Sequence, residues 1–363
     1  ASPDTALLRR AAQMDSFVES LQARIVAAGE SGTRLNIIGG NSKHFYGGAP
    51  HGEPLAMGSH QGIVSYEPTE LVVTARTGTL LVDLEQTLAE SRQMLPFEPP
   101  AFGAGATIGG TIACGFSGPA RPYRGAARDF VLGVNCVSGR GEYLRFGGQV
   151  MKNVAGYDVS RLMVGAMGTL GVMTEVSLKV LPLPVIERTL VFDCSGNDAL
   201  TKMSDLGGRP LPVTGTVWHD GKLRVRLSGS EMAVESAASS LGGDLDIAGA
   251  SFWQALKEHR LDFFGGTDPL WRLSIAPPAK MPDLPGESLV EWGGALFWVR
   301  GNDPQALVAL ARAHGGNLTR FRGAERSVSF QPLGEAEAVL NRGLKQAFDP
   351  AGILNPDRML AGS

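Results

Sequence analysis

The chain has 363 residues, 43% hydrophobic and 19% charged, which is enough apolar material for two domains with their own cores. The formal net charge is −3 and no basic run reaches five residues, which excludes broad phosphate neutralisation and hence nucleic-acid binding. No apolar run could span a bilayer, and the opening ASPDTALLRR lacks a signal-peptide core. We therefore expect a cytoplasmic protein with no transmembrane segment, and peripheral attachment at the inner membrane through partners is the alternative.

The cysteines and histidines are poorly spaced for a metal site. Cys114, Cys136 and Cys194 form no C-x-x-C pair, and the six histidines form no H-x-x-x-H pair. We expect neither a metal nor an iron–sulphur cluster held by this chain alone.

The first part of the chain alternates between helical and strand patterns. Apolar residues at helical spacing predict a helix over 17–28, preceded by a capping box of Ser16 and Glu19. Strands are predicted at 35–38, within 62–68 and within 69–77, and the stripe of leucines in 80–95 predicts an amphipathic helix. The pattern indicates an α/β unit.

Residues 96–118 are almost all Pro, Gly, Ala and Thr, and we predict neither helix nor strand there. A long loop of this kind inside a compact domain is usually functional. FVLGVNCVS and EYLRF then predict a hairpin, and RLMVGAMGTLGVMTEVSLKVLPLP predicts a short helix, a glycine turn and a strand.

The pattern changes beyond residue 185, after the predicted boundary at Pro182 and Pro184. Mixed strands and helices predict an antiparallel α+β sheet with helices on one face. The last segment, from residue 335, predicts a helix followed by a turn-rich tail.

Two glycine-rich loops suggest an anion site. GAGATIGG (103–110) misses the dinucleotide fingerprint by one residue, and GGNSK (39–43) is not a Walker A loop because Ser precedes Lys. Backbone N–H groups of such loops can still form a concave anion site, with Ser42, Ser117 and Lys43 as additional donors. We expect the loops to hold a pyrophosphate from two sides; an ordinary tight turn is the alternative for GGNSK alone.

Five segments occur in a characteristic order: GGNSK, ATIGGTIACGFSGP, RDFVLGV, KNVAGYDVSRLMVGAMGTLGVMTEVSLKVLPLP and FDPAGILNP. Together they resemble the flavoprotein family of vanillyl-alcohol oxidase and p-cresol methylhydroxylase, and more closely the FAD-binding subunits of glycolate oxidase complexes. The resemblance covers 35–184 and 346–358. It implies an α+β protein with a PCMH-type FAD-binding domain of two α/β subdomains (1–184), an α+β cap with an antiparallel sheet for substrate or partner (185–325), and a C-terminal helix and tail that return to the FAD domain (326–363).

The resemblance also implies the cofactor-binding residues. They are Gly39, Gly40, Asn41, Ser42 and Lys43 for the pyrophosphate, Gly109, Gly110, Ser117 and Gly118 along the diphosphate and ribityl chain, Gly168, Gly171 and Val172 near the cofactor, and Asn355 towards the isoalloxazine. Asn41 stands where members with covalent flavin often carry His, so we expect FAD to be bound non-covalently.

The implied activity is that of an FAD-dependent enzyme subunit. It would oxidise glycolate, a small 2-hydroxy acid, to glyoxylate and pass electrons through the flavin to an iron–sulphur partner, beside a larger FAD-containing catalytic subunit. The catalytic residues stay unassigned, with Arg272, Arg300, Arg322 and His259 as the candidates for holding a carboxylate or accepting a proton. The alternatives are a non-catalytic FAD-fold scaffold or regulatory subunit and a stand-alone FAD-dependent 2-hydroxy-acid dehydrogenase.

Overall fold

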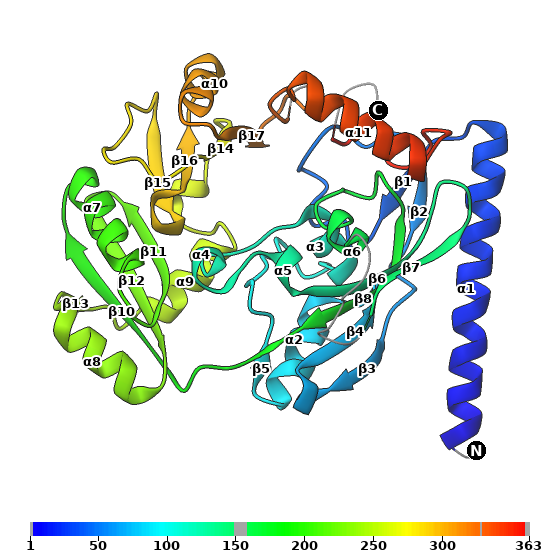
Figure 1. The fold of residues 1–363 in the computed structure, drawn as a ribbon, viewed down its shortest axis with the longest axis horizontal. Helices are drawn as coiled ribbons and strands as arrows, with labels where there is room; N and C mark the ends of the chain where they lie inside the picture. The colour runs from blue at the N-terminus through cyan, green and yellow to red at the C-terminus, as the bar shows by residue number, and fades with distance from the viewer. Residues whose placement is uncertain (1–2, 149–157, 327–328, 360–363) are drawn as a thin grey trace.

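The computed structural model describes residues 3–148, 158–326 and 329–359 (Figure 1). The KNVAGY part of one family motif, residues 152–157, lies outside the described residues. None of the helices in the described ranges combines the length and apolarity that a membrane crossing requires.

The N-terminal half contains fifteen helices and strands within its described residues, apart from one short 3₁₀ turn. In chain order they are α1 (Pro3–Ser31), β1 (Leu35–Ile38), β2 (Glu53–Ala56), β3 (Ile63–Glu67), β4 (Val72–Arg76), α2 (Leu81–Glu90), β5 (Gln93–Met94), α3 (Ile108–Cys114), α4 (Arg121–Arg124), α5 (Ala127–Phe130), β6 (Val131–Val137), β7 (Tyr143–Gly147), α6 (Val159–Leu162), β8 (Val172–Lys179) and β9 (Leu181–Pro182). The predicted strands at 35–38, 62–68 and 69–77, the helix within 80–95 and the β6–β7 hairpin are confirmed.

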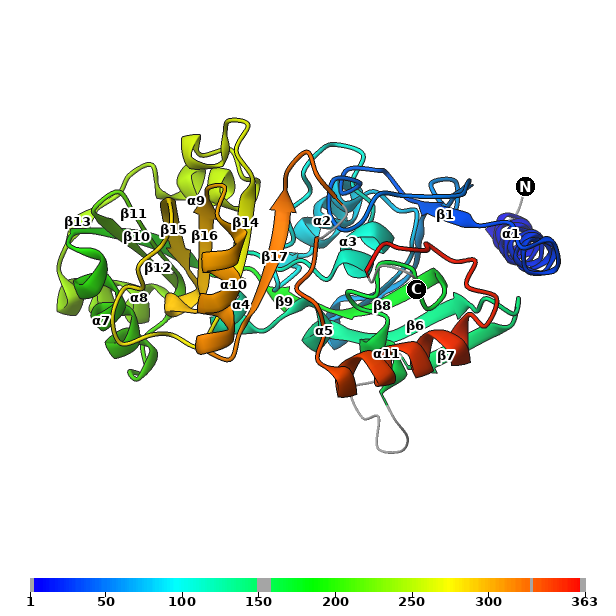
Figure 2. The same cartoon turned by 90° about the horizontal axis from the view of Figure 1, so that it is seen from above.

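A five-stranded antiparallel sheet, in the order β3-β4-β8-β6-β7, forms the centre of this half. Leucines of α2 and isoleucines of α3 pack on it in one core with Val134, Val176 and Leu178. A separate parallel pair, β1-β2, packs with α1 and with the tail residues Ile353 and Leu354. Helix α1 lies at the edge of the molecule farthest from the second half (Figures 1 and 2).

Two local predictions in this half were wrong. Ser16 is not a helix cap, because α1 begins at Pro3 and Ser16 lies in its interior. The glycine-rich segment does contain a helix, α3, whose N-cap Thr107 accepts a hydrogen bond from the Gly110 N–H. Burial of Ile108 and Ile112 in the core stabilises this helix despite its low intrinsic propensity.

The second half contains the longer sheet. Its elements are β10 (Ile186–Asp193), α7 (Gly196–Gly207), β11 (Val213–His219), β12 (Lys222–Gly229), α8 (Glu231–Leu241), β13 (Asp244–Leu245), α9 (Gly249–Lys257), β14 (Leu270–Ser274), β15 (Glu287–Glu291), β16 (Leu296–Arg300), α10 (Pro304–Ala313) and β17 (Asn317–Arg322). They form an eight-stranded antiparallel sheet in the order β13-β10-β12-β11-β15-β16-β14-β17.

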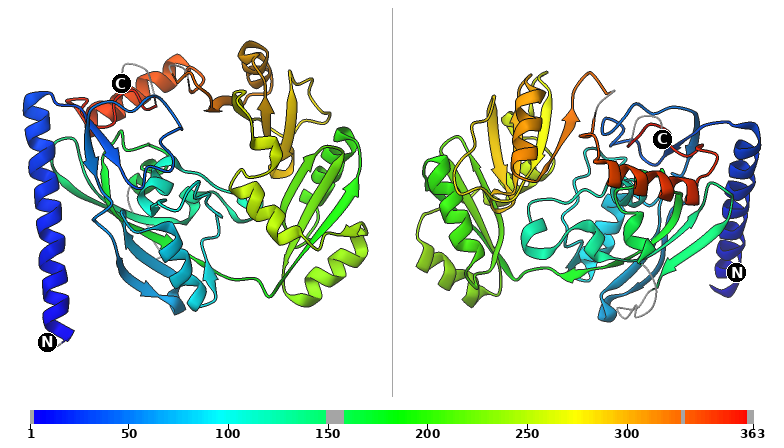
Figure 3. Two further views of the ribbon diagram at one scale, coloured as in Figure 1. Left: turned by 180° about the vertical axis from the view of Figure 1, so that it is seen from behind. Right: turned by 45° about the horizontal axis from the view of Figure 1, so that its top comes forward.

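Helices cover both faces of this sheet, so the prediction of helices on one face was wrong. α7, α8 and α10 pack on the face that carries Phe297 and Val299. α9 packs on the opposite face through Trp253 and Leu256, because alternate residues of a strand point to opposite faces. That second face also contacts aromatic residues of the N-terminal half, which form one cluster with it. Figure 3 shows the two halves side by side.

The C-terminal segment returns to the first half. Helix α11 (Glu335–Phe348) packs on it through Leu344 and Phe348 (Figure 2). The tail then places Leu354 in a parallel bridge with Leu35, next to β1. The predicted helix and turn-rich tail are confirmed.

Candidate functional site

A cavity lies between β1, α3 and the tail, with about 860 Å³ of empty space that includes its mouth open to solvent. It is lined by ten of the predicted residues: Gly39, Gly40, Asn41, Ser42, Lys43, Gly109, Gly110, Gly168, Gly171 and Asn355. These residues come from four segments that are distant in the sequence. The fold brings them together around one space.

The turn after β1 presents free backbone donors to this cavity. Asn41 has a left-handed backbone conformation with φ of 59°. The N–H groups of Gly40, Asn41, Ser42 and Lys43 have no hydrogen-bond acceptor among the described residues. Successive free N–H groups on a turn form an anion-binding concavity, and this turn therefore suits a phosphate.

Gly40 allows this turn to touch the second glycine loop. A Cβ on Gly40 would overlap the backbone carbonyl of Gly105, and a Cβ on Gly39 would approach Thr107 Oγ1. The two loops predicted to face each other are therefore in direct backbone contact. A side chain at position 40 would therefore first displace Gly105.

Two cations lie at the cavity. Lys43 is 6% exposed, and its ammonium group donates hydrogen bonds to the Ala101 carbonyl and to Ser42 Oγ at 3.1 and 3.3 Å. Burial lowers the pKa of Lys43, and the neighbouring Cys114 and Glu258 act in the opposite direction. Arg358 also lines the cavity and donates to the Gly48 carbonyl at 2.5 Å. The tail therefore supplies a buried guanidinium to this site.

Gly109 and Gly110 line the cavity, but their N–H groups are already bonded. Gly109 donates to the Thr77 carbonyl at 2.9 Å, and Gly110 donates to Thr107 Oγ1 at 3.2 Å. A Cβ on Gly109 would lie 2.5 Å from Thr77 Cβ. The role that the structure supports for Gly109 is close packing of α3 against the end of β4.

Asn355 connects two walls of the cavity. Its side-chain oxygen accepts a hydrogen bond from the Ile37 N–H at 2.7 Å, and its side-chain nitrogen donates to the Met167 carbonyl at 2.6 Å. Gly168, with φ of 75°, lies directly against this amide, because a Cβ there would be 2.8 Å from Asn355 Nδ2. Asn355 therefore positions the β1 end and the glycine turn relative to each other.

Three predicted residues do not line this cavity. Val172 is 1% exposed and packs in the core opposite Val137. Ser117 and Gly118 line a second, smaller cavity of about 400 Å³ between the loop 100–119 and the second sheet. Their assignment to the cofactor stays a prediction.

The four catalytic candidates lie in three different places in the structure. Arg272 and His259 line the second cavity. Arg300 donates to the Phe263 carbonyl at 3.2 Å and lies 3.8 Å from Asp268. Arg322 stacks over Phe45. Neither of these last two arginines lines either cavity.

Several cavity residues were missed, including Thr77, Thr107, Ala113, Cys114 and Met167. Cys114 lies in a segment that carried the family resemblance, yet its residue type alone indicated only a buried small side chain. Burial raises the pKa of its thiol to about 11, so the thiol is protonated at neutral pH. No group of three or more metal-ligating side chains converges within the described ranges.

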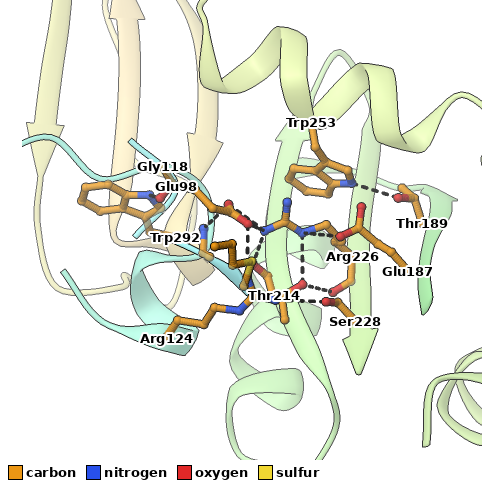
Figure 4. Close-up of polar contacts among 12 residues, drawn as sticks. Glu98, Gly118, Arg124, Glu187, Thr189, Thr214, Arg226, Ser228, Trp253 and Trp292 are labelled. Carbon is orange, nitrogen blue, oxygen red and sulfur yellow. Dashed lines mark hydrogen bonds and ion pairs between the residues drawn. The ribbon is translucent and has the colours of Figure 1, made fainter. Parts of the chain in front are cut away.

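The loop that lines both cavities is anchored to the second sheet (Figure 4). The Glu98 carboxylate accepts hydrogen bonds from Arg226 of β12, and the Gly118 carbonyl accepts one from Trp292 Nε1 at 3.2 Å. Arg124 also reaches Glu98, at 3.4 Å. The second half of the chain therefore helps to hold the glycine loop.

Comparisons with known proteins agree with this architecture. A family model described as an FAD binding domain matches residues 16–147. The crystal structure of p-cresol methylhydroxylase with substrate bound has the same fold, with a TM-score of 0.69 and 17% identity over 94% of this chain and 87% of that chain. The fold and the site thus define an FAD-dependent oxidoreductase with a PCMH-type FAD-binding domain, which confirms the predicted α+β fold and the FAD cofactor.

Similarity in sequence is more specific. Glycolate oxidase subunit GlcE of Escherichia coli K12 is 46% identical over 346 residues, which are 95% of this chain and 98% of that protein. Glycolate oxidase subunit GlcD of Bacillus subtilis 168 is 32% identical over 154 residues, 42% of this chain and 33% of that protein. The chain belongs to the family of the glycolate oxidase subunit GlcE.

Proposed function

We propose that this chain is the FAD-binding subunit of a glycolate oxidase-type complex that oxidises glycolate to glyoxylate. Its partners would be a larger FAD-containing subunit and an iron–sulphur subunit. The complex would be cytoplasmic or held peripherally at the inner membrane by those partners. The 46% identity to a glycolate oxidase subunit over nearly the whole of both chains supports the activity.

The observation that carries the cofactor assignment is the row of four free N–H groups, Gly40 to Lys43, at the 860 Å³ cavity. These donors would hold the pyrophosphate, and the buried ammonium of Lys43 and guanidinium of Arg358 would add positive charge. Asn355 would keep the two walls at a fixed separation. When bound, FAD supplies the hydride acceptor for the oxidation of a hydroxyl-bearing carbon.

The residues at the cavity favour non-covalent binding. Asn41 has no nucleophilic nitrogen, because the lone pair of a carboxamide nitrogen is delocalised. Cys114 carries a protonated thiol at neutral pH, and the thiol is a far weaker nucleophile than the thiolate. His44 also lies in the lining, with its Nδ1 3.0 Å from the Asn41 carbonyl oxygen.

Acid precipitation of the purified protein tests the cofactor assignment. We expect flavin absorbance in the native protein and release of all FAD into the supernatant. Flavin that stays with the precipitate would contradict non-covalent binding, and the His44→Ala and Cys114→Ala variants would then locate the bond. Protein that neither contains nor takes up FAD would instead support the scaffold alternative.

Purification of the tagged chain from its native cells, with iron and flavin analysis, tests the complex. We expect co-purified subunits that contain iron and additional flavin, and glycolate-dependent dye reduction by the complex. Full glycolate turnover by this chain alone would support the stand-alone dehydrogenase instead.

A further inference from the structure

The carboxylate of Glu258 holds the middle of the loop that lines both cavities. Glu258 directly follows α9 in the second half of the chain, and its side chain is 4% exposed. Its Oε1 accepts a hydrogen bond from the Ala101 N–H at 3.1 Å, and its Oε2 accepts one from the Phe102 N–H at 2.9 Å. Both oxygens of one buried carboxylate therefore bind successive N–H groups of a loop that lies 156 and 157 positions earlier.

These contacts stabilise the loop and not the helix that carries Glu258. Negative charge at the C-terminal end of a helix is unfavourable for that helix, so the favourable partners of Glu258 lie elsewhere. Lys257 lies 3.6 Å from Oε1 and offsets part of the cost of burying the carboxylate. Phe102 has a left-handed φ of 53°, which costs free energy for an aromatic residue. The two hydrogen bonds from Glu258 hold the loop in this conformation.

The peptide group between Ala101 and Phe102 connects Glu258 to the first cavity. The peptide is planar and trans, so its N–H and its carbonyl point in opposite directions. The N–H donates to Glu258, and the carbonyl accepts a hydrogen bond from Lys43 Nζ at 3.1 Å. The carboxylate therefore fixes the direction of the carbonyl that binds Lys43, and it polarises this peptide so that the carbonyl is a better acceptor.

The ammonium group of Lys43 retains one donor. It has three N–H groups, of which one is used by the Ala101 carbonyl and one by Ser42 Oγ at 3.3 Å. The third has no acceptor among the residues that the structure describes, and Lys43 lines the first cavity together with the turn after β1. Two fixed donors give the third a defined direction, which favours a charged hydrogen bond to an anion.

We propose that Glu258 is a positioning residue for the cofactor site: through the Ala101–Phe102 peptide it holds the ammonium group of Lys43 in place for a phosphate oxygen of FAD. The phosphate contact of Lys43 rests on the proposed function. Glu258 itself lines neither cavity. The second half of the chain thus contributes to FAD affinity through a residue outside the cofactor cavity.

A double-mutant cycle in FAD affinity tests this route. Full-length apoprotein is titrated with FAD, followed by flavin fluorescence, for wild type, Glu258→Gln, Lys43→Met and the double variant. We expect Glu258→Gln to weaken FAD binding by about tenfold, because an amide cannot accept both N–H groups. In the Lys43→Met background the same change should weaken binding by less than about twofold. An equal loss in both backgrounds would overturn the proposal.

Two further variants control this cycle. Glu231→Gln, at an exposed position of α8 in the same half of the chain, should bind FAD as wild type does. Ala101→Pro removes one of the two N–H donors to Glu258 and keeps the Ala101 carbonyl. It replaces Glu258→Gln if that apoprotein does not fold, as judged by circular dichroism, and should weaken FAD binding by about threefold only where Lys43 is present. Wild-type affinity in Ala101→Pro would then overturn the proposal.

The pH profile of FAD affinity distinguishes positioning from a general loss of structure. Burial lowers the pKa of Lys43, and Cys114 of α3 and Glu258 of α9 raise it. Arg358 of the tail is the other cation in the cavity lining that the loss of Glu258 leaves in place. Removal of the Glu258 charge should lower the pKa of Lys43 further, so FAD affinity should begin to fall at a lower pH in Glu258→Gln than in wild type. Coinciding profiles would contradict the coupling.

The single variants separate this inference from the proposed function. Wild-type affinity in Lys43→Met would overturn the phosphate contact of Lys43, and the route from Glu258 with it. Weaker binding in Lys43→Met together with wild-type affinity in Glu258→Gln would overturn this inference alone and leave the cofactor assignment intact.

Discussion

Arg226 donates two hydrogen bonds of 2.8 Å to the carboxylate of Glu98, 128 positions earlier in the chain (Figure 4). The arginine side chain is 6% exposed and the glutamate side chain 17%. Glu98 has a left-handed φ of 45° and also accepts a hydrogen bond from the Ala120 N–H. The loop that lines the cavities runs from Glu98 to Ala120. The pair therefore connects both ends of this loop to the sheet of the second half.

Removal of one member of this pair should destabilise the protein strongly. We expect Arg226→Met to lower the free energy of unfolding by about 3 kcal/mol, because it leaves the largely buried Glu98 carboxylate with the Ala120 N–H and the longer contact to Arg124 as its partners. Urea denaturation measures the change. Arg188→Met, which breaks the exposed pair with Glu235, is the control and should stay within about 0.5 kcal/mol of wild type. Similar losses in the two variants would contradict the role of the buried pair.

Gly40→Ala should abolish FAD binding through displacement of one loop by the other. The new Cβ would overlap the Gly105 carbonyl and separate the two loops. Flavin absorbance per mole of purified protein measures the effect. Gly58→Ala is the matched control, because no atom lies within 4 Å of a Cβ at that position. Normal flavin content in Gly40→Ala would show that contact between the loops is not needed.

Lys43→Met should weaken FAD binding by about 10- to 100-fold, because a charged hydrogen bond contributes about 1.5–3 kcal/mol. The affinity is measured by titration of apoprotein with FAD, followed by flavin fluorescence. Lys280→Met, at an exposed lysine, is the control and should leave the affinity unchanged. An unchanged affinity in Lys43→Met would remove the ammonium group from the proposed phosphate site.

His60 should make the stability depend on pH. Its ring stacks on Phe17 at 4.4 Å, and its Nε2 is buried with no hydrogen-bond partner in the described parts of the chain. Burial, followed by the charge of Arg76, lowers its pKa to about 4. The unfolded chain therefore binds more protons than the folded one between pH 6.5 and 4. The free energy of unfolding falls as the pH falls through this window, by up to about 3 kcal/mol in total.

Urea denaturation at pH 7 and pH 5 measures this dependence. The His60→Phe variant should lose less stability than wild type between these two pH values. The His51→Gln variant, at an exposed histidine, should behave as wild type does. An equal loss in wild type and His60→Phe would exclude His60 as the source.

The periodic segments were predictable because their cause is local. The segments GIVSYEP and TELVVTART predicted β3 and β4, and a stripe of leucines predicted α2. The order of the family segments likewise indicated the FAD-binding domain. In the structure, ten of the thirteen predicted cofactor residues line one cavity. Helix α3 was missed because its stability comes from burial of Ile108 and Ile112, which propensity does not register.

The sequence by itself determined the class of the protein, the order of most of its elements and the loop after β1 that lines the first cavity. Only the tertiary structure decided which groups are free to act. Within the described ranges it left the N–H groups of Gly40 to Lys43 without acceptors, and it gave those of Gly109 and Gly110 acceptors at Thr77 and Thr107. It placed Arg272 and His259 at one cavity and gave Arg300 a structural role. The reason is physical: a side chain's partners, burial and charge depend on segments more than a hundred residues away, and local sequence carries no information on those contacts.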